Sequence, residues 1–202
     1  MAAPQEEGSR HALLVRDFAN TFDADEGDRA ETLTSAAELA RWLHEHHLVS
    51  GSARAERADL ELARRLRAGL RALLLAHDEE HAPPSELAGA ASGGAVAEPL
   101  PASLTRALPL RLELRDGRPQ LVPAVAGVRG GLAALLVAVQ ESLADGSWDR
   151  LKICSADDCR WAFLDQSKNQ SRTWCSMGSC GNKAKTRTYR ARRKGKPTAD
   201  DG

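Results

Sequence analysis

The sequence has few aromatic side chains and no long apolar run. Aromatic residues make up 4% of its 202 residues, so a core has to be built mainly from Leu, Ala and Val. The longest apolar run, residues 132–139, is far shorter than the roughly 20 apolar residues that a membrane-spanning helix needs. A membrane protein is therefore not expected.

The first eight residues lack the order of a secretory signal, in which basic residues precede an apolar stretch. The sequence also lacks the dinucleotide-binding glycine pattern, the phosphate-binding loop, the nucleophile elbow and the zinc-protease motif. Its 42% hydrophobic and 28% charged residues are typical of a folded globular chain. We therefore expect a cytoplasmic protein that is not an enzyme.

Lysine is absent from the first 149 residues, and charge is unevenly distributed along the chain. Residues 1–149 carry 15 Arg against 23 Asp and Glu, a net charge of −8. Residues 150–196 carry 13 Lys and Arg against 3 Asp, a net charge of +10. Such asymmetry indicates a segment after residue 149 that binds a polyanion.

Cysteine is absent until residue 154, and the cysteines then follow in two short-spaced pairs. The four residues are Cys154, Cys159, Cys175 and Cys180. Four residues separate the members of each pair and fifteen separate the pairs, which is typical of a structural Zn²⁺ site with four thiolate ligands. Two disulfides are the alternative, which a reducing cytoplasm disfavours. A catalytic cysteine is not expected, because no His follows His81 to activate a thiol.

The cysteine-rich segment predicts a small zinc-finger module with a β-hairpin and a helix, spanning residues 150–194. The hairpin is expected between the two cysteine pairs, where the apolar stretch 160–165 suits a strand. Residues 183–194 suit a helix that ends before a Gly and a Pro. Trp161 and Trp174 are expected in its core rather than stacked on bases. A module of about 40 residues buries little core, so zinc would have to stabilise it.

The expected helix carries basic side chains along one stripe, which suits contact with phosphates and a salt-dependent affinity. The candidate nucleic-acid contacts are Asn182, Lys183, Lys185, Arg187, Arg190, Arg192, Arg193, Lys194, Arg160 and Arg172. Duplex DNA is the favoured target, and a homodimer would add specificity. Structured RNA or the ribosome is one alternative, and an acidic partner, including the chain's own first part, is another.

Residues 10–146 predict a mostly helical domain with one hairpin, so the expected fold class is mainly α with a small zinc-finger module. Helices are expected at 12–21, 35–48, 55–77 and 132–144, the last after a glycine-rich break at 127–131. A hairpin is expected from strands 110–114 and 120–122. Residues 82–103 predict a loop, and residues 195–202 a disordered tail.

Two polar groups in the first part are candidate sites. His44, His46 and His47 suggest a metal, but no further ligand completes a site by spacing, and a solvated helix end is the preferred interpretation. Asp17, Asn20 and Thr21 are candidates for a pocket that binds a small-molecule effector. The alternative is that Asn20 and Thr21 only cap a helix and turn the chain.

Several stretches resemble known families. Residues 174–182, Trp-Cys-Ser-Met-Gly-Ser-Cys-Gly-Asn, together with the two cysteine pairs, resemble the CGNR zinc finger. Asp17-Phe-Ala-Asn-Thr21, Leu39-Ala-Arg-Trp-Leu43 and Ala63-Arg-Arg-Leu-Arg67 resemble, in the right order, motifs of the ABATE domain, which commonly precedes this finger. The resemblance covers about residues 10–194. It implies a bacterial, stress-induced transcriptional regulator that binds zinc and DNA.

One position departs from the family pattern. The tetrapeptide that names the finger ends in Arg, whereas this chain has Cys180-Gly181-Asn182-Lys183. Lys offers a point charge in place of the planar fork with which Arg contacts a phosphate or a guanine edge. The zinc ligands are unaffected, but base recognition at position 183 is not expected to follow the family. Asn182 is expected either to contact a base or to cap the helix.

Overall fold

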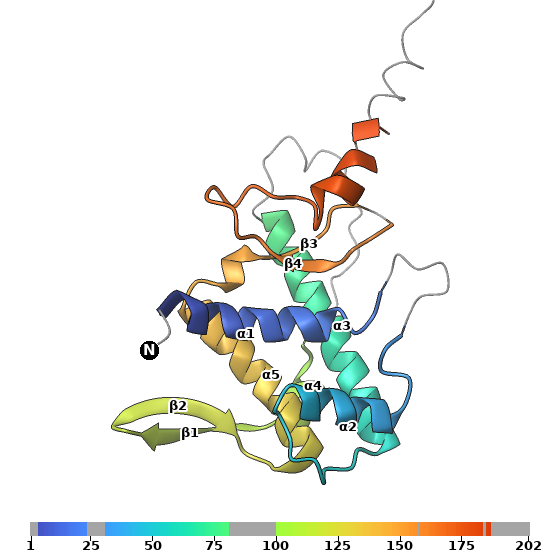
Figure 1. The fold of residues 1–202 in the computed structure, drawn as a ribbon. Helices are drawn as coiled ribbons and strands as arrows, with labels where there is room; N and C mark the ends of the chain where they lie inside the picture. The colour runs from blue at the N-terminus through green and yellow to red at the C-terminus, as the bar shows by residue number, and fades with distance from the viewer. Residues whose placement is uncertain (1–3, 24–30, 81–99, 157, 184, 187–202) are drawn as a thin grey trace, which may run out of the picture.

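Five α-helices and two antiparallel hairpins make up the described part of the computed structural model, which comprises residues 4–23, 31–80, 100–156, 158–183 and 185–186 (Figure 1). The helices are α1 (Pro4–Ala19), α2 (Ala36–Glu45), α3 (Arg57–Glu80), α4 (Ala102–Ala107) and α5 (Gly127–Ala144). The hairpins are formed by β1 (Leu110–Arg115) with β2 (Arg118–Pro123) and by β3 (Leu151–Ile153) with β4 (Ala162–Leu164). Two short helical turns, η2 (Trp148–Arg150) and η3 (Met177–Gly181), flank the second hairpin. The predicted fold class, mainly α with a small β-containing module, is confirmed.

The helices form where apolar side chains recur at three- and four-residue steps. In α3, Ala63, Leu66, Leu70 and Leu74 are fully buried in the main core, as the periodicity predicts. The helix α2 begins after Ser35, whose hydroxyl accepts a hydrogen bond from the Glu38 backbone N–H at 3.2 Å. The expected helices thus exist, although α1 begins earlier than expected and α4 lies partly in the stretch predicted as a loop. Most of that stretch, residues 81–99, is outside the described residues.

The glycine-rich break expected at 127–131 is wrong, because these residues form the first turns of α5. A Cβ on Gly130 would lie 2.4 Å from the Val125 carbonyl oxygen, and one on Gly131 would lie 2.8 Å from Val49 Cγ1. These glycines therefore allow close packing inside the fold rather than a chain break.

The first hairpin forms from the two stretches that were expected as its strands. Leu112 lies opposite Leu121, and the strands meet in a two-residue turn. Both turn residues have positive φ, 52° at Asp116 and 73° at Gly117, which is the geometry of a type I′ turn. The helix α5 packs against β2, so β1 is the outer strand.

The second hairpin differs from the expectation, because it lies around the first cysteine pair rather than between the two pairs. The strand β4 pairs with β3, which precedes the first cysteine, with Lys152 opposite Phe163. One face of this hairpin, formed by Leu151, Ile153, Ala162 and Leu164, belongs to the same core as the helices. The strands pack on α3 and α1, so the cysteine-rich module shares a core with the helical part.

Candidate metal centre

The four cysteines meet on the outer face of the second hairpin. Their Sγ atoms all lie within 4.8 Å of one another, and the Cys159–Cys175 and Cys175–Cys180 separations are both 3.7 Å. Four sulfurs bound tetrahedrally to Zn²⁺ at about 2.3 Å would lie about 3.8 Å apart, so the cluster fits the ion. The four cysteines are free thiols in the structure, which disagrees with the disulfide alternative. The expected ligands are therefore brought together as one group.

The backbone around the cysteines is fixed by hydrogen bonds within the module. The Cys154 N–H donates to the Trp161 carbonyl at 2.8 Å, and the Cys159 N–H donates to the Ala156 carbonyl at 3.0 Å. These bonds shape the loop that carries the first pair, and η3 places Cys180 of the second pair. Trp161 and Trp174 pack against the cysteine cluster with Phe163, as the core interpretation of the tryptophans predicts.

The pKa values of the cysteine thiols determine whether a metal ion has to displace protons when it binds. Burial raises the pKa of Cys159 well above its ordinary value and raises that of Cys175 to about 11. Burial also acts on Cys180, but hydrogen bonds from Cys159 and Ser179 outweigh it and lower its pKa. Without an ion, Cys159 and Cys175 are therefore neutral at pH 7, and metal binding has to release their protons.

A buried carboxylate organises the loop between the cysteine pairs. Asp165 is fully buried and accepts hydrogen bonds from the Ser167 and Arg172 backbone N–H groups, both at 2.9 Å, and from Lys152 Nζ at 3.2 Å. Burial alone would raise its pKa, but the hydrogen bonds from Ser167, Arg172 and Lys152 outweigh it and lower the pKa to about 2. This ionised side chain thus holds residues 165–172 in place.

Two basic candidates, Arg160 and Arg172, lie in the loops next to the cysteine pairs. Arg172 Nη2 donates to the Cys175 carbonyl at 2.6 Å, and its guanidinium lies 5.1 Å from the Phe163 ring centre. Arg160 is half-buried and has a positive φ of 54° between the two pairs. The Arg172 side chain is therefore engaged within the module, whereas Arg160 stays a candidate contact beside the first cysteine pair.

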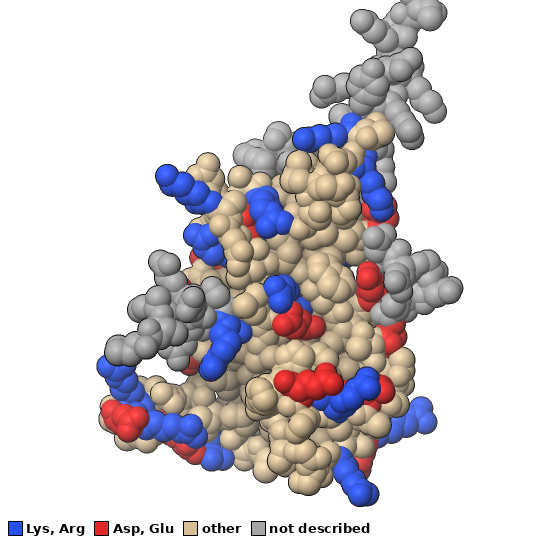
Figure 2. Space-filling view, in the orientation of Figure 1, with Lys and Arg blue, Asp and Glu red and all other residues tan. Residues whose placement is uncertain are grey.

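The remaining described candidates are exposed where the chain leaves the cluster. Asn182, Lys183 and Lys185 lie in a helical turn shortly after Cys180. Figure 2 shows several Lys and Arg side chains on the surface of the molecule in this view. Asn182 Nδ2 donates to the Gly178 carbonyl at 3.2 Å, and Lys183 Nζ lies 3.8 Å from Asp158. The other candidates lie outside the described residues, as does the expected helix beyond residue 186: Arg187, Arg190, Arg192, Arg193 and Lys194.

Asn20 connects the helical part to the module. Its Nδ2 donates to the Ala162 carbonyl at 2.8 Å, and its Oδ1 accepts from the Ala162 N–H at 2.8 Å. One amide side chain therefore satisfies both backbone groups of a residue in β4. Sequence spacing does not reveal this pairing, because the partners are 142 positions apart.

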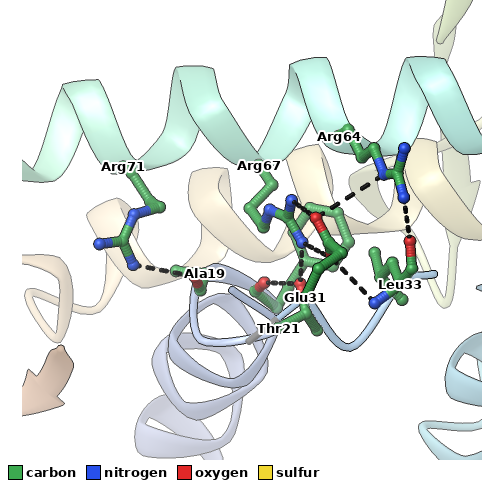
Figure 3. A network of polar contacts seen from close by, with 8 residues as sticks. Ala19, Thr21, Glu31, Leu33, Arg64, Arg67 and Arg71 are labelled. Carbon is green, nitrogen blue, oxygen red and sulfur yellow. Dashed lines mark hydrogen bonds and ion pairs between the residues drawn. The ribbon is translucent and has the colours of Figure 1, made fainter. Parts of the chain in front are cut away.

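Three arginines on one face of α3 hold the chain that follows α1 (Figure 3). Arg67 is 7% exposed, forms an ion pair with Glu31 at 2.5 Å and donates to Thr21 Oγ1 at 3.0 Å. Burial of Glu31 opposes its ionisation, but the hydrogen bond and charge of Arg67 outweigh burial and lower its pKa. Arg64 donates to the Leu33 carbonyl at 2.7 Å. Thr21 is thus a partner within this network.

The third arginine reaches the module. Arg71 donates to the Ala19 carbonyl at 3.0 Å and to the Arg160 carbonyl at 2.7 Å. It therefore links the end of α1 to the loop of the first cysteine pair. The sequence analysis did not single out Arg71. The pattern that could have identified it is its position four residues after Arg67, which places both side chains on the same face of the helix.

A cavity of about 460 Å³ lies where the helical part meets the module. Asp17, Asn20 and Thr21, the candidate pocket residues, line one side of it. The other walls include Trp42, His46, Trp161 and Cys175. Asn20 and Thr21 also have the structural roles described above, whereas the Asp17 carboxylate is paired with its neighbour Arg16.

The histidine cluster does not form a metal site within the described residues. His46 stacks on Trp42 with ring centres 3.9 Å apart, and its Nδ1 lies 2.8 Å from the Trp42 carbonyl oxygen. His44 and His47 are exposed near the end of α2. In the described ranges, the cysteine cluster is the one group of three or more potential ligands close enough to share an ion.

Comparison with known families agrees with this arrangement. Residues 150–193 match the CGNR zinc finger, and residues 13–157 match the ABATE model, described as "Putative stress-induced transcription regulator". No curated protein matches the chain. No helix in the described ranges has the length and apolarity required to cross a membrane. The second match spans well over half of the sequence, and the chain therefore belongs to the ABATE family and carries a CGNR zinc finger.

Proposed function

We propose that this protein is a zinc-dependent transcription regulator that binds duplex DNA through the basic segment following its last cysteine. The observation that carries the proposal is the four-thiol cluster, from which Lys183 and Lys185 lead into the positively charged residues 187–196. The family description supports the regulatory role. Such a protein acts in the cytoplasm, where thiols stay reduced.

The role of the metal in this proposal is structural. Zn²⁺ bound by Cys154, Cys159, Cys175 and Cys180 would cross-link the two cysteine loops. Four protein ligands leave no open coordination position for a substrate, which supports binding rather than catalysis as the function. The cluster fixes the position of Asn182 and thereby the start of the basic segment relative to the core.

The basic segment supplies the affinity in this proposal. Arg172 is engaged within the module, so the main phosphate contacts are assigned to Lys183, Lys185 and residues 187–196. Neutralising phosphates releases counterions, and the affinity then falls with salt by a slope of about −0.9 per phosphate contacted.

We assign effector sensing to the cavity between the helical part and the module. A small molecule there would contact Asp17 and lie beside the Asn20–Ala162 hydrogen bonds and Cys175. Binding would then change the free energy of the contacts that hold β4, and so influence the orientation of the finger.

Fluorescence anisotropy with labelled duplex DNA at several salt concentrations tests the proposal. The expected result is a linear decrease of the logarithm of affinity with that of salt, and a marked loss in the variant Lys183→Glu/Lys185→Glu. Lys168→Glu is the matched control, since Lys168 is exposed on the loop between the cysteine pairs and should matter little. Affinity that does not respond to salt, or preference for structured RNA over duplex DNA, would overturn the proposal.

A further inference from the structure

The outer edge of β1 carries backbone groups that β2 does not use. The two-residue turn makes Arg115 and Arg118 a hydrogen-bonded pair, and hydrogen-bonded pairs then alternate along the hairpin. The Ala124 N–H donates to the Pro109 carbonyl at 2.8 Å, which agrees with this alternation. The odd-numbered residues of β1 therefore bond to β2, and the N–H and C=O groups of Leu110, Leu112 and Leu114 point outward.

The two edges of this hairpin are not equivalent. In β2, the positions that point outward include Pro119 and Pro123, which have no N–H to donate to another strand. The helix α5 also packs on β2. The edge of β1 has no proline at its outward positions and faces away from α5, so it is the edge that can accept another strand.

The side chains of β1 divide by chemistry between its two faces. Leu112 and Leu114 are 66% and 77% exposed on one face, an unusual position for large apolar side chains. The other face carries Arg111, Glu113 and Arg115, which are ion-paired along the strand. In Figure 2, the hairpin region accordingly shows both signs of charge side by side.

We propose that β1 pairs with β1 of a second copy of this chain, antiparallel and about a two-fold axis through Leu112. Leu112 then lies opposite its own counterpart, and Leu110 lies opposite Leu114 of the other copy. Both outward-pointing sets of backbone groups are paired across the axis. On the other face, Arg111 lies opposite Glu113 of the second copy, and this favourable pair occurs twice by symmetry.

The charges select this register over its neighbours. Shifts by an even number of residues keep outward-pointing groups opposite one another, because the pattern has a period of two, so the nearest alternatives are shifts of two residues. A shift in one direction places Glu113 opposite Glu113 and Arg111 opposite Arg115, and a shift in the other places Arg111 opposite Arg111. Like charges directly opposite one another destabilise a sheet, so each alternative lacks the two favourable pairs and gains repulsion.

The oligomeric state of the full chain, measured by sedimentation velocity at several concentrations, tests the proposal. The wild type should sediment with twice the 21.7 kDa of one chain. Arg111→Glu and Glu113→Arg each replace both cross-strand attractions by repulsions and should weaken dimerisation roughly tenfold or more. An equimolar mixture of these two variants restores opposite charges at both positions and should form a heterodimer.

Two further variants distinguish loss of pairing at the edge of β1 from a general effect on the hairpin. Leu112→Pro removes an outward N–H that β2 does not use, so it should abolish the dimer while circular dichroism and zinc content stay unchanged. Arg118→Glu is the matched control, because it changes a charge on β2 away from the pairing edge. A wild type that is monomeric up to its solubility limit, a dimer that survives Leu112→Pro, or a mixture that does not associate would overturn the proposal.

Discussion

At the scale of single residues, the contact between Asn20 and Ala162 connects a family motif to the metal-binding module. The two hydrogen bonds are both 2.8 Å long and partly buried. A backbone N–H and C=O that lose their partner in such a place cost more free energy than the average hydrogen bond contributes. The presence of Asn20 in this motif is therefore explained by its hydrogen bonds to Ala162, without a ligand.

Asn20→Ala should lower the free energy of unfolding by about 1–3 kcal/mol, because it leaves both Ala162 groups without their partner. Urea denaturation followed by circular dichroism measures this change. Asn182→Ala is the matched control: its amide is exposed and makes one bond of 3.2 Å to Gly178, so a change within about 0.5 kcal/mol is expected. Equal losses in the two variants would contradict the assigned role of Asn20.

At the scale of elements, the start of α5 depends on glycines for packing. Replacing Gly by Ala inside a helix normally stabilises it by roughly 0.5–1 kcal/mol. At Gly130 the added Cβ would lie 2.4 Å from the Val125 carbonyl oxygen, a backbone atom that cannot turn away as a side chain does. At this position, helix propensity favours replacing Gly by Ala, whereas packing against Val125 disfavours the replacement.

Gly130→Ala should destabilise the protein by about 1–3 kcal/mol, the usual cost of overpacking a close contact. Gly178→Ala is the control, since its Cβ would meet nothing closer than Ser176 Oγ at 3.8 Å. Thermal unfolding of both variants distinguishes the two effects. A Gly130→Ala protein as stable as wild type would show that the turn before α5 moves to accommodate the methyl group.

The elements also show which parts of the structure follow from sequence. Regular spacing predicted the cysteine cluster, the first hairpin and the helices α1, α2, α3 and α5, because those patterns reflect contacts within a few residues or a metal's fixed geometry. The helix α4 was not predicted, and its first residues were read as part of a loop. The strand β3 was missed, because three residues are too few to show a period. The glycines at 130 and 131 were misread as a chain break, and the hydrogen bonds of Asn20 to Ala162 were missed. Both depend on contacts outside the local sequence pattern.

At the scale of the whole molecule, the metal centre and the helices are not independent bodies. Ile153 directly precedes Cys154 and belongs to the main core, whereas Phe163 in β4 packs on the cysteines. The hairpin thus has one face in each cluster. Loss of the ion should therefore destabilise the helices as well as the module.

The protein should unfold in one transition with zinc bound, and a strong chelator should lower the midpoint by roughly 8–16 °C. This range corresponds to about 4 kcal/mol of binding energy at a free metal concentration 1,000-fold above Kd. Calorimetry with and without chelator measures it. Cys175→Ser is the control, since chelator should have no further effect on it. Two separate transitions, with the helical signal unaffected by chelator, would contradict the shared core.

The prolines of β2 limit how far any strand addition can go. Pro119 and Pro123 leave one side of the hairpin without donors at two positions, whereas the other side offers a full set. Once the open side is occupied, the resulting sheet presents a proline-bearing strand at both of its borders. Growth into a fibril is therefore terminated after a single addition, and the exposed leucines of β1 do not become a template for polymerisation.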